Sequence, residues 1–155
     1  MDARIELLLA MLEQAYTRPT WHGTNLKQSL RGVTVEQALW RPAEGRHNIW
    51  EYALHCAYWK FAAQSRIRGL EAEFPRPFND FPLINSASAA DWKKDLSFLS
   101  RCHKELSAAV AGLEPEQLER KVGRWTVQEL VFGVANHDIY HAGQIQILRR
   151  LKEET

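Results

Sequence analysis

Capping motifs that mark the first turn of an α-helix constrain this chain more than any other feature. In a capping box, the side chain before the helix and the side chain three residues later each bond to the other's backbone N–H. The pattern recurs four times, as TVEQ at 34–37, NIWE at 48–51, SAAD at 88–91 and TVQE at 126–129. Helical spacing of apolar residues follows, and no strand-like alternation or hairpin signal appears. The chain is therefore predicted to be all-α.

The periodicity also gives approximate bounds for the helices. They are expected over about residues 2–16, 24–31, 48–69, 88–112 and 126–152, with a brief helical turn from Thr34 to near Arg41-Pro42. Four of them are long and amphipathic, which is typical of an antiparallel four-helix bundle with short extra helices. No internal repeat, low-complexity tract or linker interrupts the pattern, so we expect one domain over residues 1–155.

One long segment, residues 70–87, lacks helical periodicity and holds three prolines and three phenylalanines. Loops of this length are uncommon in compact domains and are often functional. Two interpretations stay open. Either the loop folds over a pocket as a lid, or it is an ordered connector whose aromatic side chains patch the core.

The composition argues against several classes of function. Of the 155 residues, 45% are hydrophobic and 25% are charged, which is ordinary for a folded globular protein. The formal net charge is only +1, and phosphate binding needs clustered Lys and Arg, so nucleic acid is not an expected partner. The apolar run near the N-terminus is too short to span a bilayer and lacks the features of a secretion signal. Because Cys56 and Cys102 are the two cysteines and show no CxxC spacing, we expect a reducing compartment, the cytoplasm.

The last expected helix carries two histidines one turn apart, His137 and His141. On a helical wheel of about 100° per residue, Val134, Ile145 and Leu148 fall within roughly 80° of His137. We therefore place both histidines in the middle of the buried stripe. A buried ring nitrogen without a partner costs about 1–3 kcal/mol, so the pair needs either a metal ion or hydrogen bonds to protein groups. From this helix alone, both explanations stay open.

A third histidine, His55, lies midway along the helix expected over 48–69. The wheel puts it about 100° from the centre of the apolar stripe, on a flank that reaches a neighbouring helix while staying near solvent. Two imidazoles from one helical turn and a third from a facing helix suit a transition metal and leave one coordination position open. Zinc and nickel are the leading candidates, although iron and copper also accept imidazole. Cys56 points away from His55 and is expected to be a buried structural thiol.

The remaining histidines are weaker candidates. His22 follows Trp21 in a glycine-containing connector and could line a pocket mouth, although a surface position explains it as well. His47 precedes a helix cap and His103 lies on a polar stretch, and we expect both side chains to be solvated.

The order of these features resembles the DinB-like superfamily of damage-inducible bacterial proteins. The resemblance is carried by WHGTNLKQSLRGVTVEQALWRP, NIWEYALHCAYWKF and the closing WTVQELVFGVANHDIYHAGQIQILRR. It implies an antiparallel four-helix bundle whose metal is held by three histidines, here matching His55, His137 and His141. It also implies a homodimer. Some relatives transfer low-molecular-weight thiols such as bacillithiol or mycothiol, others are metal-dependent hydrolases, and many have no known activity.

The residues and the resemblance together predict a metal-dependent enzyme, a thiol S-transferase or a hydrolase, that acts on a small molecule. The resemblance further implies a low-molecular-weight thiol as cosubstrate. Glu51, one turn before His55, could be a general base, although its place in the capping box explains it better. Gln144 could hydrogen-bond a substrate or water. Tyr58 and Trp59 could form the pocket wall, although core packing explains both equally well.

Two other hypotheses stay open. One is a non-enzymatic, stress-related protein whose bundle binds a metal or a small ligand without catalysis. The other is a metal-free bundle whose histidines are hydrogen-bonded core groups. The number and identity of the metal ions bound would separate these hypotheses from the enzyme.

Overall fold

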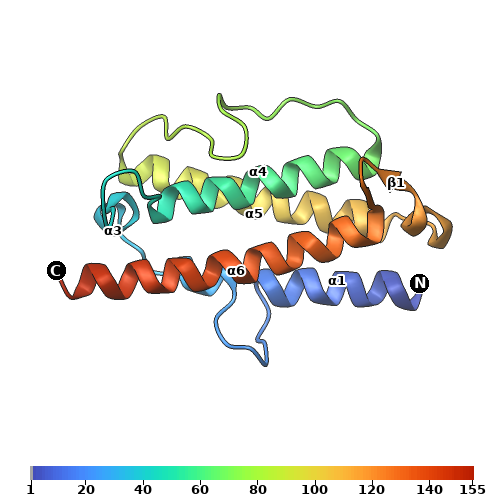
Figure 1. Ribbon diagram of the computed structural model, residues 1–155, viewed down its shortest axis with the longest axis horizontal. Helices are drawn as coiled ribbons and strands as arrows, with labels where there is room; N and C mark the ends of the chain where they lie inside the picture. The colour runs from blue at the N-terminus through green and yellow to red at the C-terminus, as the bar shows by residue number, and fades with distance from the viewer. Residues whose placement is uncertain (1) are drawn as a thin grey trace.

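The computed structural model describes residues 2–155, which form four long helices with short elements between them (Figure 1). The long helices are α1 (Ala3–Tyr16), α4 (Ile49–Arg68), α5 (Ala89–Ala111) and α6 (Val127–Glu153). The short elements are α2 (Leu26–Leu30), α3 (Val35–Leu39), the 3-10 helix η1 (Pro115–Glu119), β1 (Lys121–Val122) and β2 (Trp125–Thr126). The predicted all-α four-helix bundle is confirmed, and each long helix begins and ends within one residue of its expected bounds.

Capping boxes start the two helices that carry the three candidate histidines. The Asn48 side chain accepts a hydrogen bond from the Glu51 N–H, and the Glu51 carboxylate accepts one from the Asn48 N–H. Thr126 and Glu129 form the same reciprocal pair at the start of α6. α4 ends at Gly69, whose φ of 67° is left-handed and suits a residue without a side chain. Local signals therefore fix the ends of both helices before any tertiary contact forms.

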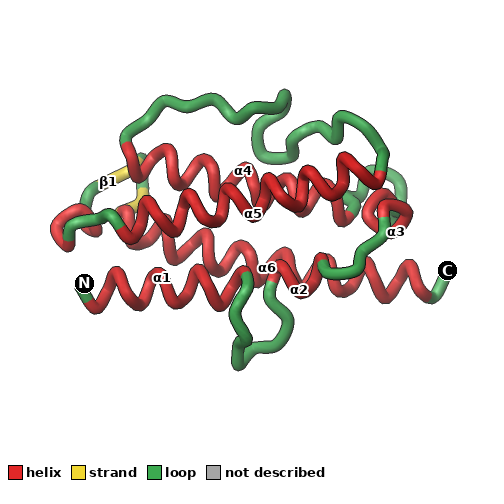
Figure 2. The backbone as a smooth tube through the Cα atoms, turned by 180° about the vertical axis from the view of Figure 1, so that it is seen from behind, coloured by secondary structure: helices red, strands yellow, loops and turns green. Residues whose placement is uncertain are grey.

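The directions of the helices explain the long loop over 70–87. α4 and α5 lie side by side and run in the same direction, as do α1 and α6, whereas α4 runs antiparallel to α6 (Figure 1). Two neighbouring helices that run in the same direction need a connection that returns along their whole length. Figure 2 shows this crossover as the loop that passes over the outside of α4 and α5. The loop thus covers one long side of the bundle.

A short hairpin corrects the expectation that the chain contains no strand. Lys121–Val122 pairs antiparallel with Trp125–Thr126. The turn between them contains Gly123, whose φ of 71° is left-handed. Strands of two residues are too short to show an alternation of apolar and polar side chains, so the sequence pattern gave no signal for them.

Two apolar clusters form the core, one toward each end of the bundle, and buried polar side chains lie between them. Along α4, the first cluster ends at Ala57 and the second begins at Ala63, with Lys60 in the gap. Asp138 holds the equivalent place along α6, and His103 along α5. We call these three residues, Lys60, His103 and Asp138, the polar layer. Within residues 2–155, no helix is both long enough and apolar enough to cross a bilayer.

Candidate metal centre

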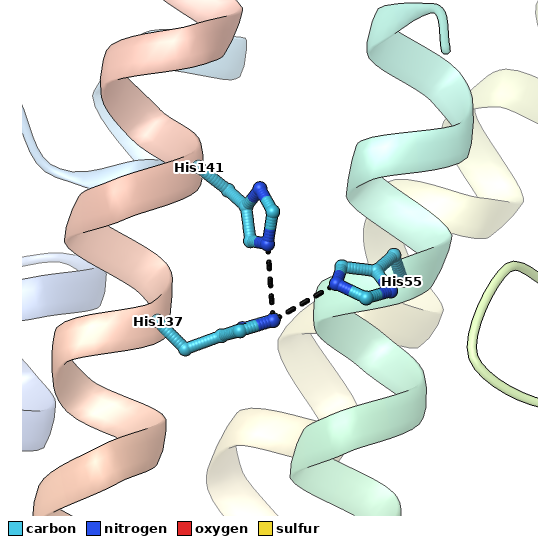
Figure 3. Close-up of side chains that lie close together, drawn as sticks. All are labelled: His55, His137 and His141. Carbon is cyan, nitrogen blue, oxygen red and sulfur yellow. Dashed lines mark hydrogen bonds between the residues drawn. The ribbon is translucent and has the colours of Figure 1, made fainter.

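Three imidazole rings meet between α4 and α6. The Nε2 atom of His137 lies 2.9 Å from Nε2 of His55 and 3.0 Å from Nε2 of His141 (Figure 3). A ring nitrogen from each of the three residues lies within 4.8 Å of the others. The three histidines singled out from the sequence are therefore brought together, and their side chains point toward one another. We call them the histidine cluster.

The position of the cluster on α6 differs from the one expected. The buried stripe of this helix centres on Asp138, so His141 is buried and His137, which lies on the stripe's edge, is half-buried. The prediction that both histidines occupy the middle of the stripe is wrong for His137. The reason is an ion pair in the polar layer: Lys60 and Asp138, both with fully buried side chains, bond to each other across α4 and α6. Lys60 supplies the partner that allows a carboxylate to take the central position.

His55 is more deeply buried than its flank position suggested. Only 6% of the residue is exposed, and the expectation that it stays near solvent is wrong. The covering group is Phe81 from the 70–87 loop, whose ring stacks on the His55 ring with a centroid separation of 4.1 Å. The other face of Phe81 stacks on His47 at 3.6 Å, so three rings form a continuous stack. Periodicity along α4 cannot reveal a cover that comes from a loop.

The outer nitrogens of two cluster rings face carbonyl oxygens. His55 Nδ1 lies 2.6 Å from the backbone oxygen of Asp80, and His141 Nδ1 lies 2.5 Å from the side-chain oxygen of Gln144. A carbonyl oxygen only accepts, so each Nδ1 carries the hydrogen that it donates. The lone pair of each ring then sits on Nε2 and points into the cluster. This is the outer arrangement that orients histidine ligands in metal sites.

Burial keeps the cluster neutral. Burial and the neighbouring rings lower the pKa of His137 to about 3, and burial, with the nearby His55, lowers that of His141 to about 4. Burial also lowers the pKa of His55, against the opposing effect of Asp80. Neutral imidazole is the form that binds transition metals. One N–H on His137 can satisfy only one of the two inward lone pairs, so the donor set fits a shared cation.

A second group of ligand-type atoms lies on the inner side of His137. The Cys56 sulfur, a ring nitrogen of His137 and an Asp138 oxygen lie within 4.8 Å of one another. Burial raises the pKa of the Cys56 thiol well above its ordinary value. The Lys60 ammonium, bonded to Asp138, already places a positive charge beside this group. A second cation is therefore disfavoured here, and Cys56 packs as a buried thiol among the residues described.

Comparison with known proteins gives the same family as the sequence motifs. The sequence model of the DinB superfamily matches residues 3–145. The chain belongs to the DinB superfamily. A crystal structure described as the conserved protein of locus from Enterococcus faecalis is similar over 100% of this chain and 99% of that one, with a TM-score of 0.73. At 18% identity this likeness shows the fold alone, and no curated protein matches the sequence.

Other residues singled out from the sequence lie around the cluster of this DinB-superfamily chain. Trp59 stands edge-on to both His55 and His137, with ring centroids 6.5 and 6.4 Å away. Gln144 contacts His141, as described above. Tyr58 packs edge-on against Trp59 and, through its other neighbour Phe74, belongs to the aromatic packing under the loop. Trp59 and Gln144 are therefore the two that touch the cluster.

Glu51 is held away from such a role by its own partners. Its carboxylate accepts two hydrogen bonds from Arg41, at 2.6 and 2.7 Å, and lies 3.1 Å from His47 Nδ1. It also accepts the capping hydrogen bond from Asn48 N–H. Against burial, which opposes ionisation, these hydrogen bonds lower the pKa of Glu51. A carboxylate so fully bonded is a poor base, and the geometry favours the capping role.

The three weaker histidines divide between surface and interior. His22 is exposed and His47 is half-buried in the ring stack with Phe81. His103 corrects the expectation of a solvated side chain, because only 3% of it is exposed. Its Nε2 lies 3.1 Å from the Glu13 carboxylate, and its ring stacks on Tyr16 at 4.1 Å. The polar neighbours of His103 on α5 indicate a solvated position, and no pattern in the sequence indicates that Glu13 and Tyr16 of α1 contact this side chain.

Sequence reasoning missed the groups that hold the cluster in place. These are the Asp80 carbonyl, the Phe81 ring and the ion pair between Lys60 and Asp138. The aromatic composition of the 70–87 loop is the one sequence signal for Phe81, and it predicts either a lid or a core patch. The connector interpretation fits Phe74, which is buried against Phe98 and the aromatic side chains of α4, while Phe81 covers one histidine ring.

Proposed function

We propose that His55, His137 and His141 bind one divalent transition metal ion, zinc or nickel, and that the protein is a metal-dependent enzyme acting on a small molecule. The observation that supports this proposal is the convergence of three neutral ring nitrogens, two of them oriented from outside by carbonyl oxygens. Three protein ligands are typical of catalytic zinc, whereas structural zinc is usually closed by four.

A metal ion held by three imidazoles acts as a Lewis acid that lowers the pKa of a bound water or thiol. The chain's own residues supply orientation and shelter. Asp80 and Gln144 fix the tautomers of His55 and His141, and Phe81 keeps solvent from the outer face of His55. Thiol S-transfer, with a low-molecular-weight thiol as cosubstrate, and hydrolysis are the two reaction classes that this arrangement serves.

We also propose that the protein forms a homodimer, as expected from the resemblance. Support comes from the outer face of α6, where Tyr140, Ile147 and Leu151 are exposed at helical spacing. Light scattering should give twice the mass of one chain, and Ile147→Lys should reduce it toward a single chain. A single-chain mass for the wild type at high concentration would contradict the dimer.

Metal analysis tests the central part of the proposal. The protein is loaded with zinc or nickel, freed of excess metal by gel filtration and analysed by mass spectrometry for metal per chain. We expect about one ion per chain in the wild type and a large loss in His55→Ala and His141→Ala. His22→Ala is the matched control, because His22 is exposed and lies outside the cluster. A wild type that retains no stoichiometric metal would contradict the proposal.

The reaction class requires a second experiment with the loaded protein. Consumption of a thiol in the presence of an alkylating electrophile supports S-transfer, and cleavage of esters or amides without thiol supports hydrolysis. The activity should disappear in His141→Ala and persist in His22→Ala. Bound metal without either activity would contradict both proposed reaction classes and favour the hypothesis of a non-enzymatic metal-binding protein.

A further inference from the structure

A cavity adjoins the histidine cluster on the side of α6 that faces the hairpin. Its volume is about 620 Å³, within the range of roughly 300–1,000 Å³ that small-molecule sites occupy. Its walls come from α1, α4, β2 and α6. The side chains that shape it are Trp59, Trp125, Leu130, Phe132, Val134 and His137. We call this space the aromatic cavity.

The exposed rings of the aromatic cavity are unusual for a surface. Trp125 and Phe132 are 51% and 52% exposed, although each is large and apolar. Together with Trp59 they present three rings from three different elements to one space. Arg124 and Arg66 lie over the Trp125 and Trp59 rings, 5.4 and 5.7 Å from their centroids. Large exposed apolar groups gathered in a hollow mark a binding site rather than ordinary surface.

The carboxylate and the amide of the cavity wall, Glu129 and Gln128, are bonded to protein, whereas Nδ1 of His137 is buried without a hydrogen-bond partner among residues 2–155. The Glu129 carboxylate accepts hydrogen bonds from the N–H and the hydroxyl of Thr126, at 2.7 and 3.0 Å. The Gln128 side chain donates to Glu119 at 2.9 Å. The three rings of Trp59, Trp125 and Phe132 are the main apolar surface of the aromatic cavity, and such rings favour an apolar and preferably planar occupant.

The cavity and the histidine cluster share a wall. His137 lines the cavity, and its Nε2 lies inside the cluster. Trp59 also lines the cavity and stands against both His137 and His55. An occupant of the cavity therefore contacts His137, a member of the cluster, and Trp59, which packs against two cluster rings.

We infer that the aromatic cavity binds the apolar, aromatic part of the substrate while the substrate's polar reacting group lies at the histidine cluster. This inference rests on the proposed function and adds a substrate class to it. The substrate is a small molecule with two parts, a flat apolar body and a group that coordinates a metal ion.

A glycine in the cavity wall allows a direct test. Gly133 lines the cavity, and a Cβ added there meets no atom within 4 Å, so Gly133→Leu starts a side chain from the cavity wall into open space. Gly143, ten residues along the same helix, is also open and lies outside the cavity wall, although it lies between Tyr140 and Ile147 on the proposed dimer face. Gly143→Leu is therefore the matched control once light scattering shows that it keeps the wild-type mass. Both changes replace a poor helix former by a good one, and both variants should fold.

The experiment compares two hydroxamic acids on the zinc-loaded protein by calorimetry. Acetohydroxamic acid carries only the metal-binding group, and 2-naphthohydroxamic acid adds a flat apolar body. We expect the naphthyl compound to bind the wild type roughly tenfold tighter or more, because its ring is buried in the cavity. Gly133→Leu should abolish most of this advantage and leave the affinity for acetohydroxamic acid unchanged. Gly143→Leu should behave like the wild type with both compounds.

Several outcomes would overturn the inference. Equal affinity of the wild type for the two compounds, with zinc bound, would reject the cavity and leave the metal proposal standing. The cavity would also be rejected if the naphthyl compound keeps its full affinity advantage in Gly133→Leu. A change in the mass of Gly133→Leu in solution, without a change in its affinity for either compound, would reject the cavity as well. Should the protein retain no zinc, the proposed function fails, and 2-naphthamide then tests the cavity on the metal-free protein. Binding of 2-naphthamide to the wild type, with loss of binding in Gly133→Leu, would support an apolar site in the cavity. Failure of 2-naphthamide to bind the wild type would reject that site.

Discussion

At the scale of single residues, the ion pair between Lys60 and Asp138 is the most demanding feature of this chain. Both side chains are 0% exposed, and one Asp138 oxygen has no hydrogen-bond partner among residues 2–155. Burial raises the pKa of Asp138, and Lys60 opposes that rise. Two charges out of water are tolerated only because each is the other's partner. The pair therefore adds little net stability, because its attraction mainly offsets the cost of removing two charges from water.

Removing one member of this pair should be costly. Asp138→Leu leaves the Lys60 ammonium buried without its carboxylate, and we expect the free energy of unfolding to fall by about 3–5 kcal/mol. Urea denaturation at pH 7 measures this change. Adding Lys60→Met should restore most of the loss, since no buried charge then remains. A double variant as unstable as the single one would contradict this account.

His103 should make stability depend on pH. Burial and the nearby Lys60 lower its pKa to about 4, against the raising effect of Glu13. In the unfolded chain the pKa is near 6.5, so between about pH 6.5 and 4 the unfolded chain binds a proton that the folded one does not. The stability from neutral His103 is thus complete above pH 6.5 and is lost as the pH falls toward 4.

Replacing His103 by Gln removes this titration and keeps a donor for Glu13. The decrease in unfolding free energy between pH 7 and pH 4.5 should become smaller than in the wild type by on the order of 2 kcal/mol. Urea titrations of both proteins across this pH range provide the measurement. His22→Gln, at an exposed position, should follow the wild-type curve. Identical pH profiles for wild type and His103→Gln would show that His103 is not the group responsible.

At the scale of elements, the 70–87 loop does more than connect α4 to α5. It delivers the Asp80 carbonyl to His55 and the Phe81 ring to its face. Two non-glycine residues of this loop, Phe78 and Asp80, have left-handed φ values of 63° and 72°. Such conformations cost energy and persist only where the surroundings require them. Here the contacts of Asp80 and Phe81 with His55, Trp59 and His47 provide that requirement.

Removing the Phe81 ring should uncover His55 without unfolding the bundle. In metal-free Phe81→Ala, modification of His55 by diethyl pyrocarbonate should become several-fold faster, followed by peptide mass spectrometry. The unfolding free energy should decrease by about 1–3 kcal/mol, because two ring stacks and part of the buried area of the ring are lost. Phe78→Ala is the control, since Phe78 is an exposed ring of the same loop. Equal rates of modification at His55 in all three proteins would refute a covering role for Phe81.

What the sequence predicts well at this scale is local. The capping pairs at Asn48 and Thr126 fixed helix starts, because those hydrogen bonds join residues three apart. The path of the 70–87 loop was not predictable, because proline and phenylalanine content gives no direction in space. The β1–β2 hairpin also escaped detection, since two-residue strands have no period.

At the scale of the whole molecule, the proposed metal ion would join α4 to α6 across the bundle. A ligand that binds only the folded state stabilises it by about 2.7 kcal/mol at a concentration one hundred times its dissociation constant. For a chain of this size, that corresponds to a rise in the unfolding midpoint of roughly 5–10 °C. Differential scanning fluorimetry with added zinc or nickel should show this rise in the wild type. EDTA should reverse it, and His141→Ala should lack it.

The sequence identified the three ligand candidates and missed what surrounds them. His137 and His141 are recognisable because four residues span one helical turn, and His55 because it is the histidine of a facing helix. The supports come from long-range contacts: Asp80 lies 25 residues from His55, and Lys60 lies 78 residues from Asp138. One sequence gives no register between helices and therefore no such pairs. The aromatic cavity likewise joins elements that are far apart in the chain.

The adjacency of His137 and Asp138 has a consequence for metal exchange. Asp138 fastens α6 to Lys60 in the interior of the bundle, while the preceding residue meets His55 on the same α4. A rotation or sliding of α6 would break both contacts, so the ion pair keeps the ring nitrogens aligned by itself. In zinc fingers the ion assembles the fold, and its removal unfolds the chain. Here one ion could leave and another could bind while the metal-free bundle stays folded. The metal bound would then depend on the concentrations of the available metal ions as well as on ligand chemistry.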